Sequence, residues 1–508
     1  MRSNLPALIV ALAAAAVSSG WGCGSAKNND GGFPGGSSSG SSGSGGGTDG
    51  GSSSSGGSGS SSGFGKFGDA GMPPPMEAGI GCTNLQCDIQ SCDGGKPTSI
   101  SGKVMDPAGH NPLYNVVVLI PNTQNGTLPL IPDGLNANSC SCGALFAGEE
   151  PIVDTVTAAD GTFTLKNVPS GTNIPLVVQI GKWRKEVVLP TVTACQDNPA
   201  GAINLPKNGT DGLFASLPSI AVSTGGADTL ECLLARIGID EAEFTGDPNS
   251  PKHVHIFQGA GGSTTASPAA PISSASLWDS DADLKRYDIT MLSCEGAPTF
   301  GANSQTVADY VSAGGRVFGE HFHYQFFANT TQFPNTANWT PGGSYSGQIT
   351  GSVQTTLLNG NAFPEGQALE MWLTNVGALT NNLLPIQVAR QDATVVASNV
   401  STPWVVTGPT VSPAGTQYFS WDMPFNPPVS DAGVPEYCGR VVFSDLHVSG
   451  ASSDPLPGTF TVPTGCSSAT LSPDEDAIEF IFFDLSSCVV PIGYPPKPPP
   501  AGPEAGVQ

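Results

Sequence analysis

The amino-acid sequence predicts a multidomain protein, with an N-terminal β-sandwich followed by a C-terminal α/β domain that has a doubly wound parallel sheet and a β- and loop-rich insertion. From residue 99, short stretches of alternating apolar and polar residues are separated by turn residues, which is typical of a sandwich. From residue 228, helical and strand-like stretches alternate, which is typical of a parallel sheet. We place the sandwich at residues 81–222 and the α/β domain at residues 223–490.

The first residues have the features of a signal peptide. Arg2 supplies a positive charge, and the apolar residues 8–17 that follow are too few to span a bilayer. Small residues precede Cys23, an arrangement that resembles the lipobox of bacterial lipoproteins, in which the Cys is lipidated. The alternative is ordinary signal cleavage nearby, with Cys23 incidental. We expect a lipoprotein signal peptide at residues 1–23, and an exported protein held at the outer membrane or cell surface by lipid on Cys23.

The segment after the signal peptide, residues 24–80, consists almost entirely of Gly and Ser. Such a segment has no apolar surface to offset the entropy of ordering, so we expect a disordered linker with a reach of roughly 40 Å. Residues 491–508 are rich in Pro and predict a solvated tail.

The charge of the chain excludes one class of partner. Its 508 residues include 42 acidic and 18 basic side chains, which gives a net charge of −24. A protein this acidic is repelled by phosphate backbones, so nucleic acid is not expected as a partner.

The cysteine count predicts disulfides and one unpaired thiol. Of the twelve Cys, eleven remain if Cys23 carries lipid, and most of these should pair in an oxidising compartment. Because eleven is odd, at least one thiol is unpaired or intermolecular, and Cys294, at the end of a predicted buried strand, is a candidate. The closely spaced cysteines at 82, 87 and 92 and at 140 and 142 are alternatively zinc ligands, although no Cys-x2-Cys pair supports this.

Two motifs identify the predicted sandwich more closely. The stretch SGKVMDPAG at residues 101–109 is a strand that enters a turn, and TAADGTFTLKNVPSG at residues 157–171 has an Asp-Gly turn before an alternating strand. Together they resemble the carboxypeptidase regulatory-like (prealbumin-like) family, over residues 98–205. That resemblance implies a sandwich whose relatives often serve in adhesion or carbohydrate binding, so a carbohydrate or an envelope protein is an expected partner.

One aromatic residue of this domain has two interpretations. Trp183, next to Arg184 and Lys185, is either an exposed ligand platform or a buried strand residue between solvated charges. We favour the buried position, because large aromatic side chains are mostly buried.

The C-terminal domain is predicted from alternating helices and strands. We expect these elements, in chain order: a helix at 228–237, strands at 252–257 and 284–293, a helix at 306–315, a strand at 316–319, an insertion at about 329–437 with a helix at 364–376, and a last helix that begins at the capping box of Ser472 and Glu475.

The runs YDITMLSCEG at 287–296, VADYVSAGGRVFGEHFHY at 307–324 and CGRVVFSDLHVSG at 438–450 resemble the class I glutamine-amidotransferase-like fold, in its trehalose-utilisation-protein-like branch. The resemblance covers about residues 225–490. In glutamine amidotransferases a nucleophilic Cys follows the strand after the Gly-Gly turn, whereas here Glu320 and His321 stand at that place. We therefore do not expect glutaminase activity by the family mechanism.

Polar side chains at three predicted strand ends form the candidate site. Because ligands of open α/β sheets bind beyond the carboxyl ends of the strands, these side chains are expected to share a rim. Imidazoles and carboxylates suit Zn²⁺ or Fe²⁺, so a metal, zinc or iron, is one hypothesis. The candidate metal ligands are His321, His323, His447, Asp445 and Glu320. The candidate catalytic residues are His321 as base, Cys294 as nucleophile, and Glu295. The alternative is that these histidines are structural and that Cys294 is a buried thiol.

The sequence thus leads to two hypotheses about function. The first is a cell-envelope lipoprotein with a role in binding or assembly, whose amidotransferase-like domain lacks the family nucleophile. The second is a secreted hydrolase that acts on a glycan or a peptide through a histidine-rich, metal-dependent site.

Overall fold

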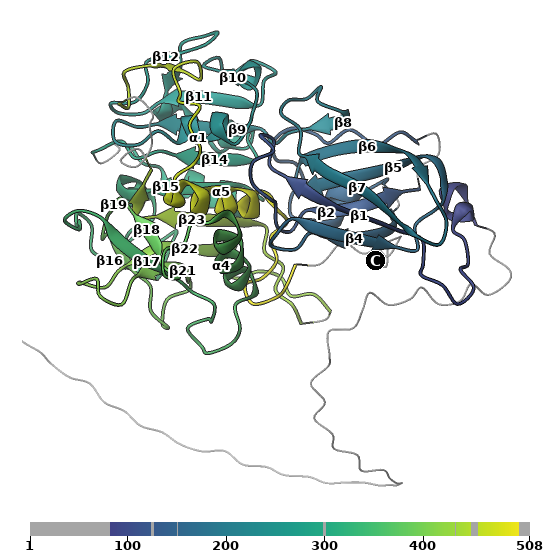
Figure 1. Cartoon of the computed structure of the whole chain (residues 1–508). Helices are drawn as coiled ribbons and strands as arrows, with labels where there is room; N and C mark the ends of the chain where they lie inside the picture. The colour runs from purple at the N-terminus through teal and green to yellow at the C-terminus, as the bar shows by residue number, and fades with distance from the viewer. Residues whose placement is uncertain are drawn as a thin grey trace, which may run out of the picture. The chain divides into compact units, whose positions relative to one another are not determined.

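The computed structural model describes residues 82–122, 126–149, 151–297, 301–431, 433–448 and 456–496 (Figure 1). The expected signal peptide, Cys23, the Gly/Ser linker and most of the Pro-rich tail lie outside the described residues. The described residues belong to one unit, residues 77–508, and more of them are in strands than in helices. This confirms a β-rich multidomain protein. Within the described residues, no helix combines the length and apolar character needed to cross a membrane.

The N-terminal domain contains two sheets. In the smaller sheet β1 lies between β4, to which it is antiparallel, and β7, to which it is parallel. The larger sheet has the order β3-β2-β5-β6-β8 and is antiparallel throughout. The strands are β1 (Ser99–Met105), β2 (Val117–Pro121), β3 (Pro151–Val156), β4 (Thr162–Lys166), β5 (Gly171–Ile180), β6 (Trp183–Val192), β7 (Asp197–Asn204) and β8 (Leu213–Ser216).

The core of this domain lies between the two sheets. In β4, Phe163 and Leu165 are buried and the residues between and beside them are exposed, which is the period of two expected for a strand with one buried face. Trp183 is fully buried, and its ring centroid lies 5.8 Å from that of Phe483. Trp183 is therefore a core residue, and the interpretation as an exposed ligand platform was wrong.

The C-terminal domain is built on a further sheet, which has eleven strands. Its first half has the order β10-β11-β9-β14-β15-β23, and every pair in it is parallel. The chain starts at β9, moves to β11 on one side, and then returns to β14, β15 and β23 on the other, so its direction of winding reverses between β9 and β14. These strands are β9 (Ile220–Thr224), β10 (Phe244–Thr245), β11 (Val254–Gln258), β14 (Ile289–Leu292), β15 (Arg316–Glu320) and β23 (Gly439–Ser444), and β13 (Ile272–Ser273) also pairs with β11.

The insertion expected at residues 329–437 extends this sheet. Four of its strands continue the sheet beyond β23 with antiparallel pairing, in the order β22-β21-β17-β18. They are β17 (Ile349–Val353), β18 (Leu384–Ile386), β21 (Thr402–Thr407) and β22 (Thr416–Met423). The remaining short strands form the pairs β12 (Thr265–Ala266) with β25 (Thr461–Val462), β16 (Asn338–Trp339) with β20 (Ala393–Thr394), and β19 (Val388–Ala389) with β24 (Leu446–His447).

Helices cover both faces of the large sheet. One hydrophobic core contains residues of three helices, the sandwich and one face of the sheet, and a second core contains residues of two helices and the other face. The helices of the first core are α1 (Leu230–Arg236), α4 (Pro364–Val376) and α5 (Pro473–Ser486), and those of the second are α2 (Asp281–Leu284) and α3 (Ser304–Ser312).

Two expectations about boundaries need comment. The domain boundary expected at residues 222/223 falls inside β9, whereas the last sandwich strand, β8, ends at Ser216. The strand expected at 284–293 begins only at Ile289, because Ser280 accepts a hydrogen bond from the Asp283 N–H and caps α2 immediately before it.

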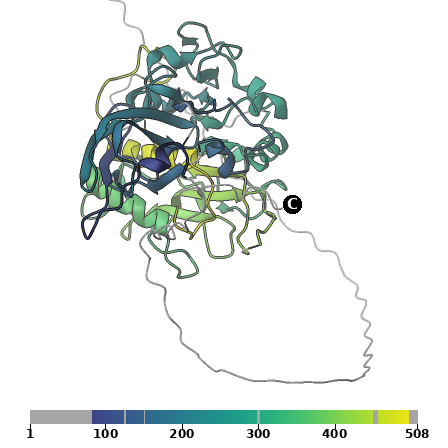
Figure 2. The same cartoon turned by 90° about the vertical axis from the view of Figure 1, so that its right-hand side faces the viewer.

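Helix α5 packs against both domains (Figure 2). The capping box predicted for its start is present, since the Ser472 N–H donates to Glu475 Oε2 at 2.8 Å. Aromatic contacts then join the helix to both domains: the ring of Phe480 lies 5.7 Å from that of Tyr114 in the sandwich and 5.7 Å from that of Trp372 in α4. The helix is therefore buried on several sides.

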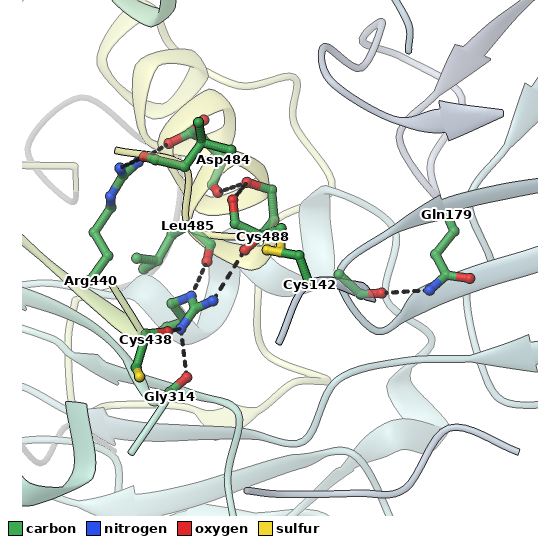
Figure 3. The surroundings of a disulfide bond; sticks show 12 residues. Cys142, Gln179, Gly314, Cys438, Arg440, Asp484, Leu485 and Cys488 are labelled. Carbon is green, nitrogen blue, oxygen red and sulfur yellow. Dashed lines mark hydrogen bonds and ion pairs between the residues drawn. A yellow bond between two sulfur atoms is a disulfide. The ribbon is translucent and has the colours of Figure 1, made fainter. Parts of the chain in front are cut away.

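Disulfides link the same regions. The part of the chain that the structure describes contains five, between residues 82 and 87, 92 and 195, 140 and 438, 142 and 488, and 232 and 466, and Cys294 is free and buried. The prediction of a disulfide framework with Cys294 unpaired is confirmed, and the zinc alternative for residues 82–92 and 140–142 is wrong. Figure 3 shows the Cys142–Cys488 bond, which joins the long loop between β2 and β3 to the segment after α5.

Buried carboxyl groups lie where α5 meets the sandwich. The Asn111 amide donates to Asp476 Oδ1 at 3.1 Å and to Glu479 Oε2 at 2.7 Å. Burial raises the pKa of Asp476 to about 6, opposed by the Asn111 hydrogen bond and reinforced by the charges of Asp474 and Asp106. Burial also raises the pKa of Glu479 well above its usual value.

The raised pKa values of Asp476 and Glu479 predict that the protein loses stability as pH rises. A carboxyl whose pKa is higher in the folded chain stabilises the fold fully below pH about 4 and loses that contribution as pH rises through about 6. We expect Asp476→Asn to reduce the fall in the free energy of unfolding between pH 4 and 7 by about 2 kcal/mol, measured by denaturant unfolding. The exposed control Asp309→Asn should follow the wild-type profile, and an unchanged profile for Asp476→Asn would contradict the prediction.

Candidate functional site

Three donor atoms meet at the carboxyl edge of the parallel strands. Cys294 follows the end of β14, His321 follows β15, and His447 ends β24, just after β23. The carboxyl ends of parallel strands lie at one edge of a sheet, and one ligand atom from each of these three side chains lies within 4.8 Å of the others. Cys294 Sγ is 3.3 Å from His321 Nδ1. The structure therefore brings together one thiol and two imidazoles from separate parts of the chain.

His321 occupies an unusual backbone position. Its φ is +32°, in the left-handed region that a residue with a side chain rarely adopts, and it connects β15 to the 3₁₀ helix of residues His321–Phe326. The strand ends at Glu320, so His321 and His323 do not share a strand face. The imidazole stands where the resemblance to glutamine amidotransferases would require a Cys, and the nearby sulfur comes instead from the end of the neighbouring strand.

A carboxylate of the insertion lies beside His321. Asp392 Oδ2 lies 3.3 Å from His321 Nε2, the ring nitrogen remote from Cys294. Asp392 is itself held, because its Oδ1 accepts the Gly342 N–H at 2.7 Å and its own N–H donates to Asp445 Oδ2 at 2.7 Å. Sequence reasoning missed Asp392, since it lies in a segment without a recognisable motif or period.

Three expected metal ligands surround the cluster without joining it. Asp445 Oδ2 accepts backbone N–H groups of the segment that carries Asp392, and Glu320 Oε2 accepts the Cys294 N–H at 3.1 Å. His323 Nδ1 lies 3.2 Å from the Glu320 carbonyl oxygen, and its Nε2 lies 3.9 Å from Glu295 Oε1. Glu320 therefore helps to hold the loop that carries Cys294, and Asp445 helps to hold the segment that carries Asp392.

Burial keeps the imidazoles neutral. It lowers the pKa of His321 to about 3, helped by the charges of Arg390 and His323. It lowers the pKa of His323 to about 4, and it lowers that of His447 well below the usual value. A neutral imidazole has a lone pair to offer, either to a proton or to a metal.

Burial also keeps the thiol protonated. It raises the pKa of Cys294 strongly, although hydrogen bonds from the backbone N–H groups of Gly296 and Phe322 to the sulfur act in the opposite direction. The pKa of Glu320 is raised well above its usual value, first by burial and then by the charge of Asp228. Without a cation to stabilise the thiolate, Cys294 is a poor nucleophile.

The arrangement suits two kinds of chemistry. Cys294, His321 and Asp392 follow each other as a nucleophile, a base and an orienting carboxylate would. Cys294, His321 and His447 also form a metal-binding set of one sulfur and two nitrogens. The second imidazole favours the metal, because His447 Nε2 is buried and has no hydrogen-bond partner among the described residues.

A cavity of about 280 Å³ lies at the opposite, amino end of the strands, against the loop between β2 and β3. The charged groups in its wall are already engaged. Lys182 Nζ is 2.5 Å from Asp288 Oδ1, and the Arg316 guanidinium donates to backbone carbonyl oxygens, including that of Cys438 at 2.7 Å. The wall therefore presents no charged group ready to recognise a ligand.

Comparison with known proteins leaves the fold family open. No known family matches the chain, and no curated protein matches it. A chain of a type II cohesin–X–dockerin complex from Acetivibrio cellulolyticus matches at 16% identity, over 25% of this chain and 76% of that one, with a TM-score of 0.15. A 9R-lipoxygenase from Cyanothece PCC8801 matches at 10% identity, over 24% and 19%, with a TM-score of 0.14. The dioxygenase domain of a dioxygenase–carbohydrate-binding protein fusion from Streptomyces sp. SirexAA-E matches at 18% identity, over 40% and 98%, with a TM-score of 0.10. Scores this low assign neither fold nor function.

Proposed function

We propose that this chain is an exported cell-envelope protein whose C-terminal domain holds a transition-metal ion between the Cys294 sulfur and the imidazoles of His321 and His447. The observation that carries the proposal is the convergence of these three donor atoms within 4.8 Å of one another. His321 lies 27 positions after Cys294 in the sequence, and His447 lies 126 positions after His321. Their convergence either serves a function or results from packing alone. The distances and the surroundings favour a function.

The spacing of the donors matches that of a metal site. Bonds of about 2.3 Å to sulfur and about 2.0 Å to nitrogen place those two atoms roughly 3.5 Å apart around a tetrahedral ion. Cys294 Sγ and His321 Nδ1 are 3.3 Å apart. An ion therefore requires an adjustment of only a few tenths of an ångström at this pair.

The surroundings of His321 also fit a ligand. Metal-bound histidines almost always present their second ring nitrogen to a carboxylate, a carbonyl or water, which fixes the tautomer and makes the other nitrogen more basic. Asp392 stands in that position, 3.3 Å from His321 Nε2. The metal would stabilise the Cys294 thiolate, and Asp392 would keep Nδ1 of His321 free to coordinate.

The location at the envelope is part of the same proposal. It is supported by the sequence of residues 1–23, by the Gly/Ser-rich segment that follows, and by the five disulfides, which are typical of an oxidising compartment. The sandwich would then be the part that binds a carbohydrate or an envelope protein, as its resemblance to carboxypeptidase regulatory-like domains implies. The parallel strand order agrees with the proposed amidotransferase-like ancestry of the C-terminal domain.

The alternative function, a secreted hydrolase acting on a glycan or peptide, uses the same residues. It is favoured by the contacts of His321, which lies between Cys294 and Asp392 as the base of a nucleophilic triad lies between the nucleophile and the carboxylate. However, a substrate must reach the sulfur, and the Cys294 and His321 side chains belong to residues that are only 0% and 4% exposed. Burial therefore favours the metal-holding function.

The metal proposal predicts a stoichiometric ion. We expect about one equivalent of transition metal in the full-length protein after dialysis, measured by elemental analysis, because three donors from separate strands are already in place. Cys294→Ser and His447→Gln should each lose most of it, while His110→Ala, a change at an exposed histidine, should retain it. Circular dichroism would show that the variants are folded. No metal in the folded wild-type protein, even after addition of Zn²⁺, Co²⁺ or Cu²⁺, would contradict the proposal.

A second prediction concerns Asp392. Asp392→Asn keeps the size of the side chain but removes its charge, so we expect the metal affinity to fall by about 10- to 100-fold, measured in competition with a chromophoric chelator. The same change at the exposed Asp309 should leave the affinity unchanged. Equal affinities for Asp392→Asn and wild-type protein would show that Asp392 does not orient a ligand.

A third prediction tests the anchor. We expect Cys23→Ser to release the protein from the membrane fraction of a bacterial host that processes lipoproteins, because one Cys at this position would carry the lipid. Labelling with a radioactive fatty acid should mark the wild-type chain and not the variant. If both chains fractionate alike and neither is labelled, ordinary signal cleavage is the correct interpretation.

A further inference from the structure

The number of donors distinguishes between metals. Among the residues that the structure describes, the converging group has three members, Cys294, His321 and His447. Structural zinc sites almost always have four protein ligands, and catalytic zinc sites have three together with a water or substrate in an open position. The three residues here are 0%, 4% and 2% exposed, which leaves little room for an open position. The site therefore matches neither common pattern of zinc.

Iron also fits poorly. Non-haem Fe²⁺ sites typically combine two histidines with one carboxylate. The carboxylates expected to play that part, Glu320 and Asp445, do not belong to the converging group, and each gives one oxygen to backbone N–H groups, of Cys294 in one case and of Asp392 and Ala393 in the other. The third donor is a sulfur, which favours a softer metal.

A trigonal set of two histidines and one cysteine is the arrangement of copper sites in which the thiolate is a strong ligand. In such sites, hydrogen bonds to the sulfur and an apolar surrounding tune the metal. Cys294 Sγ lies 3.3 Å from His321 Nδ1, and the Cys294 side chain is fully buried. The aromatic ring of Phe322 also covers His321, with the ring centroids 3.9 Å apart.

The two imidazoles are held by rigid elements. His447 lies in β24, paired in register with Val388 of β19. His321 stands at the end of β15, at a constrained φ of +32°, with Asp392 at its second ring nitrogen. A rigid ligand set imposes its geometry on the ion, and three fixed donors disfavour the four-fold square arrangement that Cu²⁺ adopts with flexible ligands.

We propose that the Cys294–His321–His447 centre is a copper site, with the Cys294 thiolate and the two imidazoles as its three strong ligands. The inference rests on the proposed function and specifies its metal. On binding of Cu²⁺, a copper–sulfur bond replaces the S–H bond, the proton leaves to solvent, and no electron is transferred. We assign copper here, rather than the zinc or iron expected from the sequence, because the Cys294 sulfur belongs to the converging group and the carboxylates of Glu320 and Asp445 do not.

The test uses the full-length protein, stripped of metal with a chelator and kept folded. Cu²⁺, Co²⁺ and Zn²⁺ are added separately, and visible absorption and electron paramagnetic resonance are recorded. We expect one equivalent of Cu²⁺ to produce an intense thiolate-to-copper charge-transfer band and a narrow copper hyperfine splitting. Cys294→Ser should abolish the band, His447→Gln should abolish or shift it strongly, and His110→Ala should leave it unchanged.

The outcomes distinguish the assignment of copper from the existence of a metal site at Cys294, His321 and His447. A band with these properties supports a copper site. Binding of Co²⁺ or Zn²⁺ through Cys294, together with Cu²⁺ that gives no charge-transfer band or oxidises the thiol, overturns the copper assignment and leaves the metal centre standing. Failure of all three ions to bind the folded protein overturns both. A copper band that persists in Cys294→Ser places the ion elsewhere and also overturns the inference.

Discussion

The parallel pairing of β14, β15 and β23 is the constraint on which the site depends. Parallel strands end at the same edge of a sheet, so the residues that follow them, Cys294, His321 and those leading to His447, are brought to one place. Burial of such polar groups is costly unless each has a partner. Glu320 accepts the N–H of Cys294, and Asp445 accepts the N–H of Asp392, the carboxylate beside His321.

The second requirement is a rigid support, which the sandwich and α5 supply together. Trp183 and Tyr114 of the sandwich pack on α5, whose other contacts reach α4 and the face of the sheet. The Cys142–Cys488 bond closes a loop with a sequence separation of 346 residues. In the loop-closure description, such a bond stabilises the folded chain by roughly 5–6 kcal/mol by restricting the unfolded one. Because this bond joins the loop between β2 and β3 of the sandwich to the segment after α5, neither domain can move far from the other.

Much of the local structure could be predicted from the sequence. The helix expected at residues 364–376 coincides with α4, because Pro at its start and Gly377 after its end mark both boundaries. The unpaired Cys294 was predicted from the eleven cysteines that remain if Cys23 carries lipid, and from its place at the end of a buried strand. The site was harder to predict. The sequence did not predict the 3₁₀ helix into which the chain turns at His321, and Asp392 has no local signature at all.

The sequence by itself determined which groups were available: an odd thiol, histidines at strand ends, acidic residues beside them, and enough cysteines for a disulfide framework. These follow from composition, periodicity and turn residues, which act over a few positions along the chain. Only the tertiary structure decided which groups meet. Asp392 stands next to His321 because β19 pairs with β24, with Val388 opposite His447, and because the Asp392 N–H donates to Asp445, so that the segment after β19 is held at the edge that carries His321. Long-range pairing leaves no trace in the spacing of neighbouring residues, so the meeting of Cys294, His321 and His447, with Asp392 beside them, emerged only from the fold.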